Sequence, residues 1–155
     1  MPEARRIRFM LRAVYRGPAW HGPAIRDLLE GVSAETAAAH PIDGSHSIWQ
    51  LVLHMTYWRT VAAGALAGGP VDENPPHELD WPAVDDTGPE AWQRTLDGLE
   101  ASQQALLAAL ADLADEGLEE NVAGRDYSLY FLVHGIVQHD VYHAGQIALL
   151  KKAAG

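Results

Sequence analysis

The sequence predicts an all-α protein, a single four-helix bundle domain that occupies residues 1–155. Four long segments carry apolar residues at the three-to-four-residue spacing of helices with one buried face. No segment shows the strict alternation of a half-buried strand. Apolar residues make up 48% of the 155 residues, which is enough to form one hydrophobic core.

The first helical segment is predicted over residues 5–31 as one broken helix. Gly17-Pro18 interrupts it, because proline cannot continue the helical hydrogen-bond pattern. Its apolar positions at helical spacing are Ile7, Met10, Leu11, Val14, Ile25, Leu28 and Leu29. A short helix is expected to follow, with Ser33 as its N-cap and an end before Pro41.

The second helix is predicted from Ser47 to about Leu66. Ser47 and Gln50 have the spacing of a capping box, and Gly68-Gly69-Pro70 is a stop signal. Its inward stripe consists of Leu51, His54, Trp58, Val61 and Ala65. His54 is therefore expected to point into the bundle.

Residues 69–88 are rich in Pro, Gly and Asp and are predicted to be a long connection that Trp81 pins to the bundle. Thr87 and Glu90 have the spacing of a second capping box. The third helix is therefore expected over residues 88–114.

The fourth helix is predicted to begin at a cap formed by Asp126 or Ser128 and to end at about Lys152. The long connection before the third helix can return the chain to the opposite end of the bundle. This allows an up-down-down-up topology, in which the second and fourth helices are antiparallel.

Charge and composition exclude several classes of function. The net charge of -10 argues against binding to nucleic acid and to anionic membrane surfaces. No apolar run is long enough to span a bilayer, and the N-terminus lacks the features of a signal peptide. Cysteine is absent, so no disulfide or thiolate is expected. A cytoplasmic protein is predicted.

Three of the eight histidines are expected on inward helix faces. His139 and His143 stand one turn apart in the fourth helix, and His54 lies on the second. Neutral imidazoles four residues apart can bind one metal ion. Three such ligands leave positions open for water or substrate, as in catalytic metal sites. The alternative is a set of buried histidines that are bonded to carbonyls or carboxylates.

Gln146 shares the helical phase of both histidines in the fourth helix. Its amide does not titrate, so we expect it to orient substrate or a bound water by hydrogen bonds. The sequence lacks the motifs of other metal sites and of nucleotide-binding sites. The chain contains no Glu-x-x-His, no His-Glu-x-x-His, no phosphate-binding loop and no dinucleotide fingerprint.

Two segments, Ser45–His54 and Gln138–Ile147, resemble the DinB superfamily, the DinB/YfiT-like metalloenzymes. The resemblance implies an up-down-down-up bundle that is often dimeric. It also implies a divalent metal ion held by His54, His139 and His143. Nickel or zinc is the expected ion, with iron or manganese as alternatives. Some members of the family use low-molecular-weight thiols, as S-transferases or isomerases.

The sequence leaves three hypotheses for function. The first is a metal-dependent enzyme that acts on a small molecule, with a thiol as cosubstrate in an S-transfer reaction. The second is a metal-dependent hydrolase, in which water is the nucleophile. The third is a non-catalytic, metal-binding dimeric bundle. The expected partners are a small-molecule substrate and a second copy of the chain, and neither nucleic acid nor a membrane.

Overall fold

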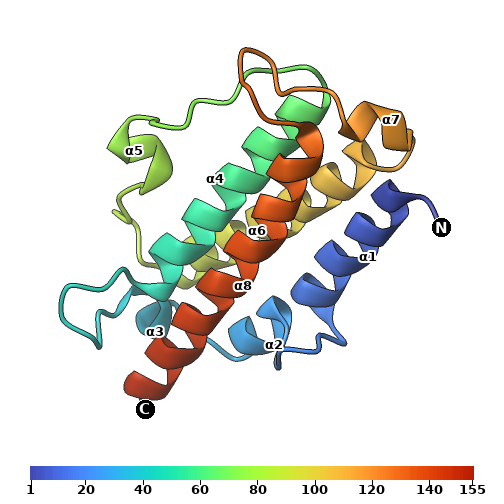
Figure 1. The fold of residues 1–155 in the computed structure, drawn as a ribbon. Helices are drawn as coiled ribbons and strands as arrows, with labels where there is room; N and C mark the ends of the chain where they lie inside the picture. Colours follow the sequence, from blue (N-terminus) through green and yellow to red (C-terminus); the bar gives the residue numbers. More distant parts are fainter.

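The computed structural model describes residues 1–155 and is all-helical, with eight helices and no strand. The helices are α1 (Glu3–Arg16), α2 (Ile25–Leu29), α3 (Ala34–Ala38), α4 (Ile48–Leu66), α5 (His77–Asp80), α6 (Pro89–Ala109), α7 (Asp115–Leu118) and α8 (Leu129–Ala153). Figure 1 shows α1, α4, α6 and α8 as the four long elements of the body. None of the helices combines the length and the apolar composition that a membrane span requires.

Helix α4 packs against both α6 and α8 (Figure 1). Near the starts of α4 and α6, Trp49 Nε1–H donates to Thr95 Oγ1 at 2.9 Å. At the other end of α4, Ala65 packs in one apolar cluster with Leu129, the first residue of α8. Helices α4 and α8 therefore run in opposite directions, and the middle of α8 passes the middle of α4.

Serine side chains begin three of the helices, as the sequence predicts. Ser47 Oγ accepts from the Gln50 amide at 3.2 Å, and Gln50 Oε1 accepts from the Ser47 amide at 3.0 Å. Ser33 caps α3 through its side chain, and Ser128, rather than Asp126, caps α8. The start of the helix that carries His54 is thus fixed by local hydrogen bonds.

The bounds of α6 differ from the prediction at both ends. The predicted capping box at Thr87 is wrong, because Gly88 is the N-cap and offers no side chain. The Gly88 amide instead donates to Asp86 Oδ1 at 2.9 Å. The helix ends at Ala109 instead of residue 114. The chain then turns so that Asp115 Oδ1 accepts from the Glu3 amide, at 2.8 Å, at the start of α1.

The segment predicted as one broken helix forms two separate helices, α1 and α2. Gly17 ends α1 with a φ of +81°, a left-handed conformation that glycine adopts without steric cost. The predicted connection over residues 69–88 also contains the short helix α5, which the sequence pattern did not indicate.

Most of the buried apolar side chains belong to two clusters, one toward each end of the long helices α4 and α8. The first contains Leu51 and Met55 of α4 with Ile147 of α8, and the second contains Ala62 of α4 with Ile136 of α8. Between these levels, three helices bury polar side chains: Arg59, Ser102, Gln103 and Asp140. The core is therefore two apolar regions divided by a polar layer.

Candidate metal centre

The three predicted histidines come together between α4 and α8. His139 Nε2 lies 2.9 Å from His54 Nε2 and 3.0 Å from His143 Nε2. One ring nitrogen from each residue lies within 4.8 Å of the others. His54 and His143 are buried, and His139 is half-buried. The helical spacing of His139 and His143 and the crossing of α4 against α8 thus create a group that could hold a metal ion.

The opposite ring nitrogens of two of these histidines face acceptors. His54 Nδ1 lies 2.9 Å from the Asp80 carbonyl oxygen and 2.9 Å from Asp80 Oδ1. His143 Nδ1 lies 2.5 Å from Gln146 Oε1. Because these partners accept, both Nδ1 atoms carry the proton, and each Nε2 presents a lone pair to His139.

This donor set fits a cation. His139 Nε2 faces the lone pairs of His54 and His143, and a neutral imidazole has one N–H to share between them. A divalent ion among the three nitrogens would accept all three lone pairs. The acceptors behind His54 and His143 are the partners that metal-binding imidazoles ordinarily have.

Burial keeps the imidazoles of His139 and His143 in the form that binds metal. It lowers the pKa of His139 to about 3, and the charges of His143, His54 and Arg59 act in the same direction. Burial also lowers the pKa of His143. Both rings are therefore neutral at neutral pH, and no proton has to leave before a metal ion binds.

The end of α5, Asp80, and the residue that follows it, Trp81, cover one side of the group. The Trp81 ring stacks on His54 with the centroids 3.8 Å apart and the planes at 6°. It also stacks on His46, at 3.5 Å and 2°. Trp58 Nε1–H donates to Asp80 Oδ1 at 2.8 Å, which orients the carboxylate that faces His54. This segment holds His54 by a hydrogen bond and by ring stacking.

The sequence predicts the three imidazoles but misses Asp80. Trp81 is predicted to pin the connection, and it does so against the ring of His54. The only signal for Asp80 is its place beside that tryptophan. A Pro-rich connection has no helical periodicity from which to infer where its side chains point. Gln146, predicted to orient substrate or water, has its side-chain oxygen on His143.

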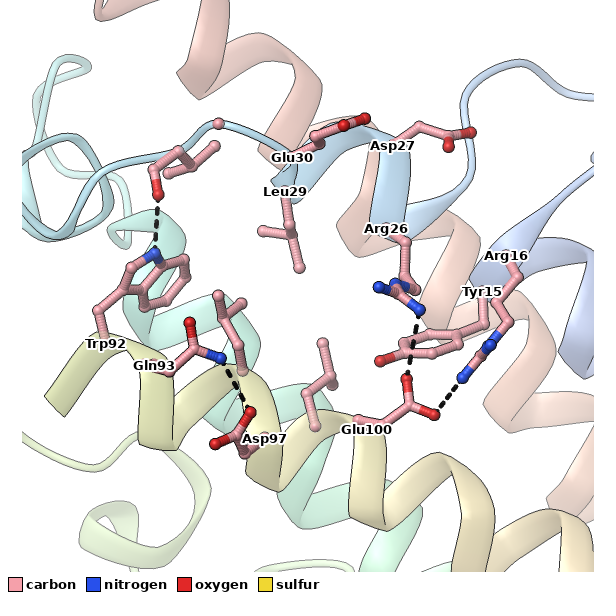
Figure 2. A pocket seen from close by; sticks show the side chains of 14 residues that line it. Tyr15, Arg16, Arg26, Asp27, Leu29, Glu30, Trp92, Gln93, Asp97 and Glu100 are labelled. Carbon is pink, nitrogen blue, oxygen red and sulfur yellow. Dashed lines mark hydrogen bonds and ion pairs between the residues drawn. The ribbon is translucent and has the colours of Figure 1, made fainter. Parts of the chain in front are cut away.

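A separate cavity of about 1000 Å³ lies between α1, α2 and α6 (Figure 2). Its apolar lining includes Leu29, Val32, Trp92, Leu96 and Leu99. At one end Glu100 pairs with Arg16 and faces Tyr15, whose pKa burial and Glu100 raise to about 12. None of the three clustered histidines lines this cavity. The candidate site is therefore identified by its chemistry and not by the size of a pocket.

Comparison with known proteins supports the resemblance of the two histidine segments. The family model of the DinB superfamily matches residues 20–147, a span that includes all three histidines. No similar protein of curated function and no similar solved structure was found. Because the match covers most of the chain, the protein belongs to the DinB superfamily.

Proposed function

We propose that this protein is a metal-dependent enzyme that acts on a small molecule, with one divalent ion held by His54, His139 and His143. The observation that carries this proposal is the meeting of three Nε2 atoms, two of which are fixed as lone-pair donors. Once bound, a divalent ion supplies Lewis-acid activation of a coordinated water or thiol.

Nickel or zinc is the proposed ion. Imidazole nitrogen suits both, and also iron, whereas manganese is better suited to oxygen ligands. The protein should be purified without chelator, and its metal content measured by mass spectrometry. We expect about one divalent ion per chain, as for a three-histidine site with an open coordination position. The emptied protein can then be refilled with nickel, zinc, iron or manganese, and the four affinities compared.

The proposed reaction is transfer of a low-molecular-weight thiol to an electrophilic small molecule, the kind of reaction that some members of the superfamily carry out. The test is to offer the metal-loaded protein a thiol with a panel of electrophiles, and separately a panel of esters. We expect a thiol conjugate that depends on the metal. Hydrolysis of esters alone would identify a hydrolase. If metal only raised the melting temperature, the protein would be a non-catalytic metal-binding bundle.

The contact between Gln146 and His143 gives a first prediction. Gln146→Leu removes the acceptor for the Nδ1–H of His143, so this ligand loses its fixed direction. Loss of such a partner weakens metal affinity by about 10–100-fold. Gln146→Glu keeps an acceptor and should retain the affinity, measured by competition with a chromogenic chelator.

The opposite result is informative. Parental metal affinity in Gln146→Leu, combined with reduced turnover, would mean that Gln146 acts on substrate or water, as the sequence predicts. We propose that Gln146 positions the His143 ring through its contact with Nδ1.

We also propose the up-down-down-up arrangement for the four long helices. It is supported by the opposite directions of α4 and α8 and by contacts of α1 with α6. Gln103 Nε2–H of α6 donates to the Leu11 carbonyl in the second half of α1, at 3.2 Å. The Ala4 amide, at the start of α1, donates to Asp115 Oδ1 beyond the end of α6, at 3.2 Å. These two contacts make α1 antiparallel to α6.

A homodimer is proposed on the basis of an exposed apolar stripe on α8. Phe131, Tyr142 and Leu149 recur on one helical face, and their exposed fractions are 66%, 66% and 62%. Aromatic residues are enriched at interfaces. Light scattering is expected to give twice the 16.9 kDa mass of one chain at micromolar concentration. A Tyr142→Glu variant should shift the mass toward the monomer, and a monomeric parent would contradict the proposal.

A cytoplasmic location stays a prediction.

A further inference from the structure

A buried ion pair joins the two helices that carry the histidines. Arg59 of α4 and Asp140 of α8 are both 0% exposed. Arg59 Nε and Nη2 donate to Asp140 Oδ2 at 3.1 and 2.9 Å. The guanidinium carbon lies 4.9 Å from the centroid of the Tyr15 ring. No other ion pair in the protein is this deeply buried on both sides.

The pair lies close to the metal centre along both helices. Asp140 directly follows His139 in α8. Arg59 comes five residues after His54 in α4, which is about 7 Å along the helix axis. Both residues belong to the polar layer that divides the apolar core. The interaction is therefore the nearest polar link between α4 and α8 outside the histidine group itself.

Stability does not explain why this pair is present. Replacing a buried ion pair with apolar side chains of similar size is often neutral or stabilising, because the charges lose their hydration. Here the cost is higher still, since Arg59 Nη1 and Asp140 Oδ1 have no hydrogen-bond partner. Burial raises the pKa of the Asp140 carboxyl, with Arg59 opposing it. An apolar pair would fill the same space without these penalties.

Compared with apolar packing, the ion pair adds a preferred geometry to the contact between α4 and α8. Two N–H groups of the planar Arg59 guanidinium meet one carboxylate oxygen of Asp140, so the contact favours one height of α8 against α4. Apolar side chains pack acceptably over a range of sliding movements. A metal site tolerates deviations of only about 0.2 Å in its ligand distances. The two ligand-bearing helices therefore need a more exact register than apolar packing provides.

We propose that Arg59 and Asp140 are positioning residues for the metal centre. They set the register of α4 against α8, so that Nε2 of His54 meets Nε2 of His139 and His143. This inference rests on the proposed metal-binding function. It assigns to the buried pair a role in metal affinity and ligand geometry that is separate from the stability of the fold.

The test is the double variant Arg59→Met with Asp140→Val, compared with the parent. We expect the metal-free double variant to melt at or above the temperature of the metal-free parent. Its affinity for cobalt and zinc should fall at least about tenfold, as for loss of other groups that orient metal ligands. The visible absorption spectrum of the cobalt form should also change, because it reports the ligand arrangement directly.

A matched control comes from the same polar layer. Gln103 is buried in α6, which carries no histidine ligand, and its Oε1 also has no partner. Gln103→Leu should leave the cobalt spectrum and both affinities at parental values. If Gln103→Leu changed them as much as the double variant did, general disturbance of the core would be the cause and the proposal would be wrong.

Arg59→Lys tests the proposal if the double variant does not fold. Lysine keeps the charge but cannot make the two directed bonds, so we expect lower metal affinity and an altered cobalt spectrum. Parental affinity and spectrum in either variant would overturn the positioning role. If the parent itself bound no metal, the proposed function would fail first, and this inference would fail with it. The two failures are distinguished by measuring metal binding of the parent.

Discussion

Replacing His139 with alanine is expected to remove nearly all bound metal from the purified protein. His139 Nε2 is the central atom of the group, 2.9 Å from His54 Nε2 and 3.0 Å from His143 Nε2. Loss of a group that only orients a ligand costs about 10–100-fold in affinity, and loss of a ligand should cost more. Metal per chain should be measured by mass spectrometry on parent and variant purified in parallel.

His134 provides a matched control for this experiment. It lies on the same helix, outside the group, where its ring packs 4.3 Å from that of Tyr130. His134→Ala should keep the full metal content. The assignment of the site is wrong if a variant with His54, His139 and His143 all changed to alanine binds metal as well as the parent does.

Acid is expected to destabilise the metal-free protein between the pKa values of His139 in the unfolded and folded states. Burial, His143, His54 and Arg59 lower this pKa from 6.5 to about 3. Above 6.5 the ring is neutral in both states, so pH has no effect through this group. Between the two values the unfolded chain takes up a proton that the folded chain does not. The free energy of unfolding therefore falls as pH falls.

The pKa of His143 is also lowered, so this residue adds to the effect in the same direction. The measurement is the melting temperature of the metal-free and metal-loaded forms across this pH window. The loaded form should melt higher at neutral pH, because metal binds the folded state. As pH falls, the metal-loaded form should lose its metal at the same pH at which its helical circular dichroism signal is lost.

His139→Ala removes the titrating group, so this variant should show a shallower decline with pH. A melting temperature that stays constant across the window in the metal-free parent would contradict the prediction. Release of metal well above the pH at which the helices unfold would also contradict it, because it would mean that protons compete directly for the folded site.

The elements that the sequence predicts most closely are those with local chemical signals. The start of α4 is set by Ser47 and Gln50, which are only three residues apart in the sequence. Ser128 sets the start of α8 in a similarly local way. The end of α6 is less accurate because it depends on a distant contact. Its end follows the turn that brings Asp115 to the amides of α1, and the sequence between them contains no sign of this pairing.

The residues of the candidate site show the same difference between local and distant information. Helical phase places His139 and His143 on one face and turns His54 inward, so periodicity is enough to find the three histidines that come together. Asp80 and Arg59 are different, since each acts across a contact between segments that are far apart in the chain. Their roles depend on how the helices pack, which is information that no short stretch of sequence contains.

The contact between His54 and Asp80 divides the connection between α4 and α6 into parts that should tolerate insertions and deletions differently. Residues 74–76 and 85–87 are largely exposed, and added residues there would lengthen a surface loop at little cost. The Asp80 carbonyl oxygen lies 2.9 Å from His54 Nδ1, and one residue added between Pro76 and Trp81 would move it away. The same insertion would rotate the Trp81 indole off the His54 imidazole. Among proteins that share this centre, the loop should therefore vary in length on either side of one turn of constant length.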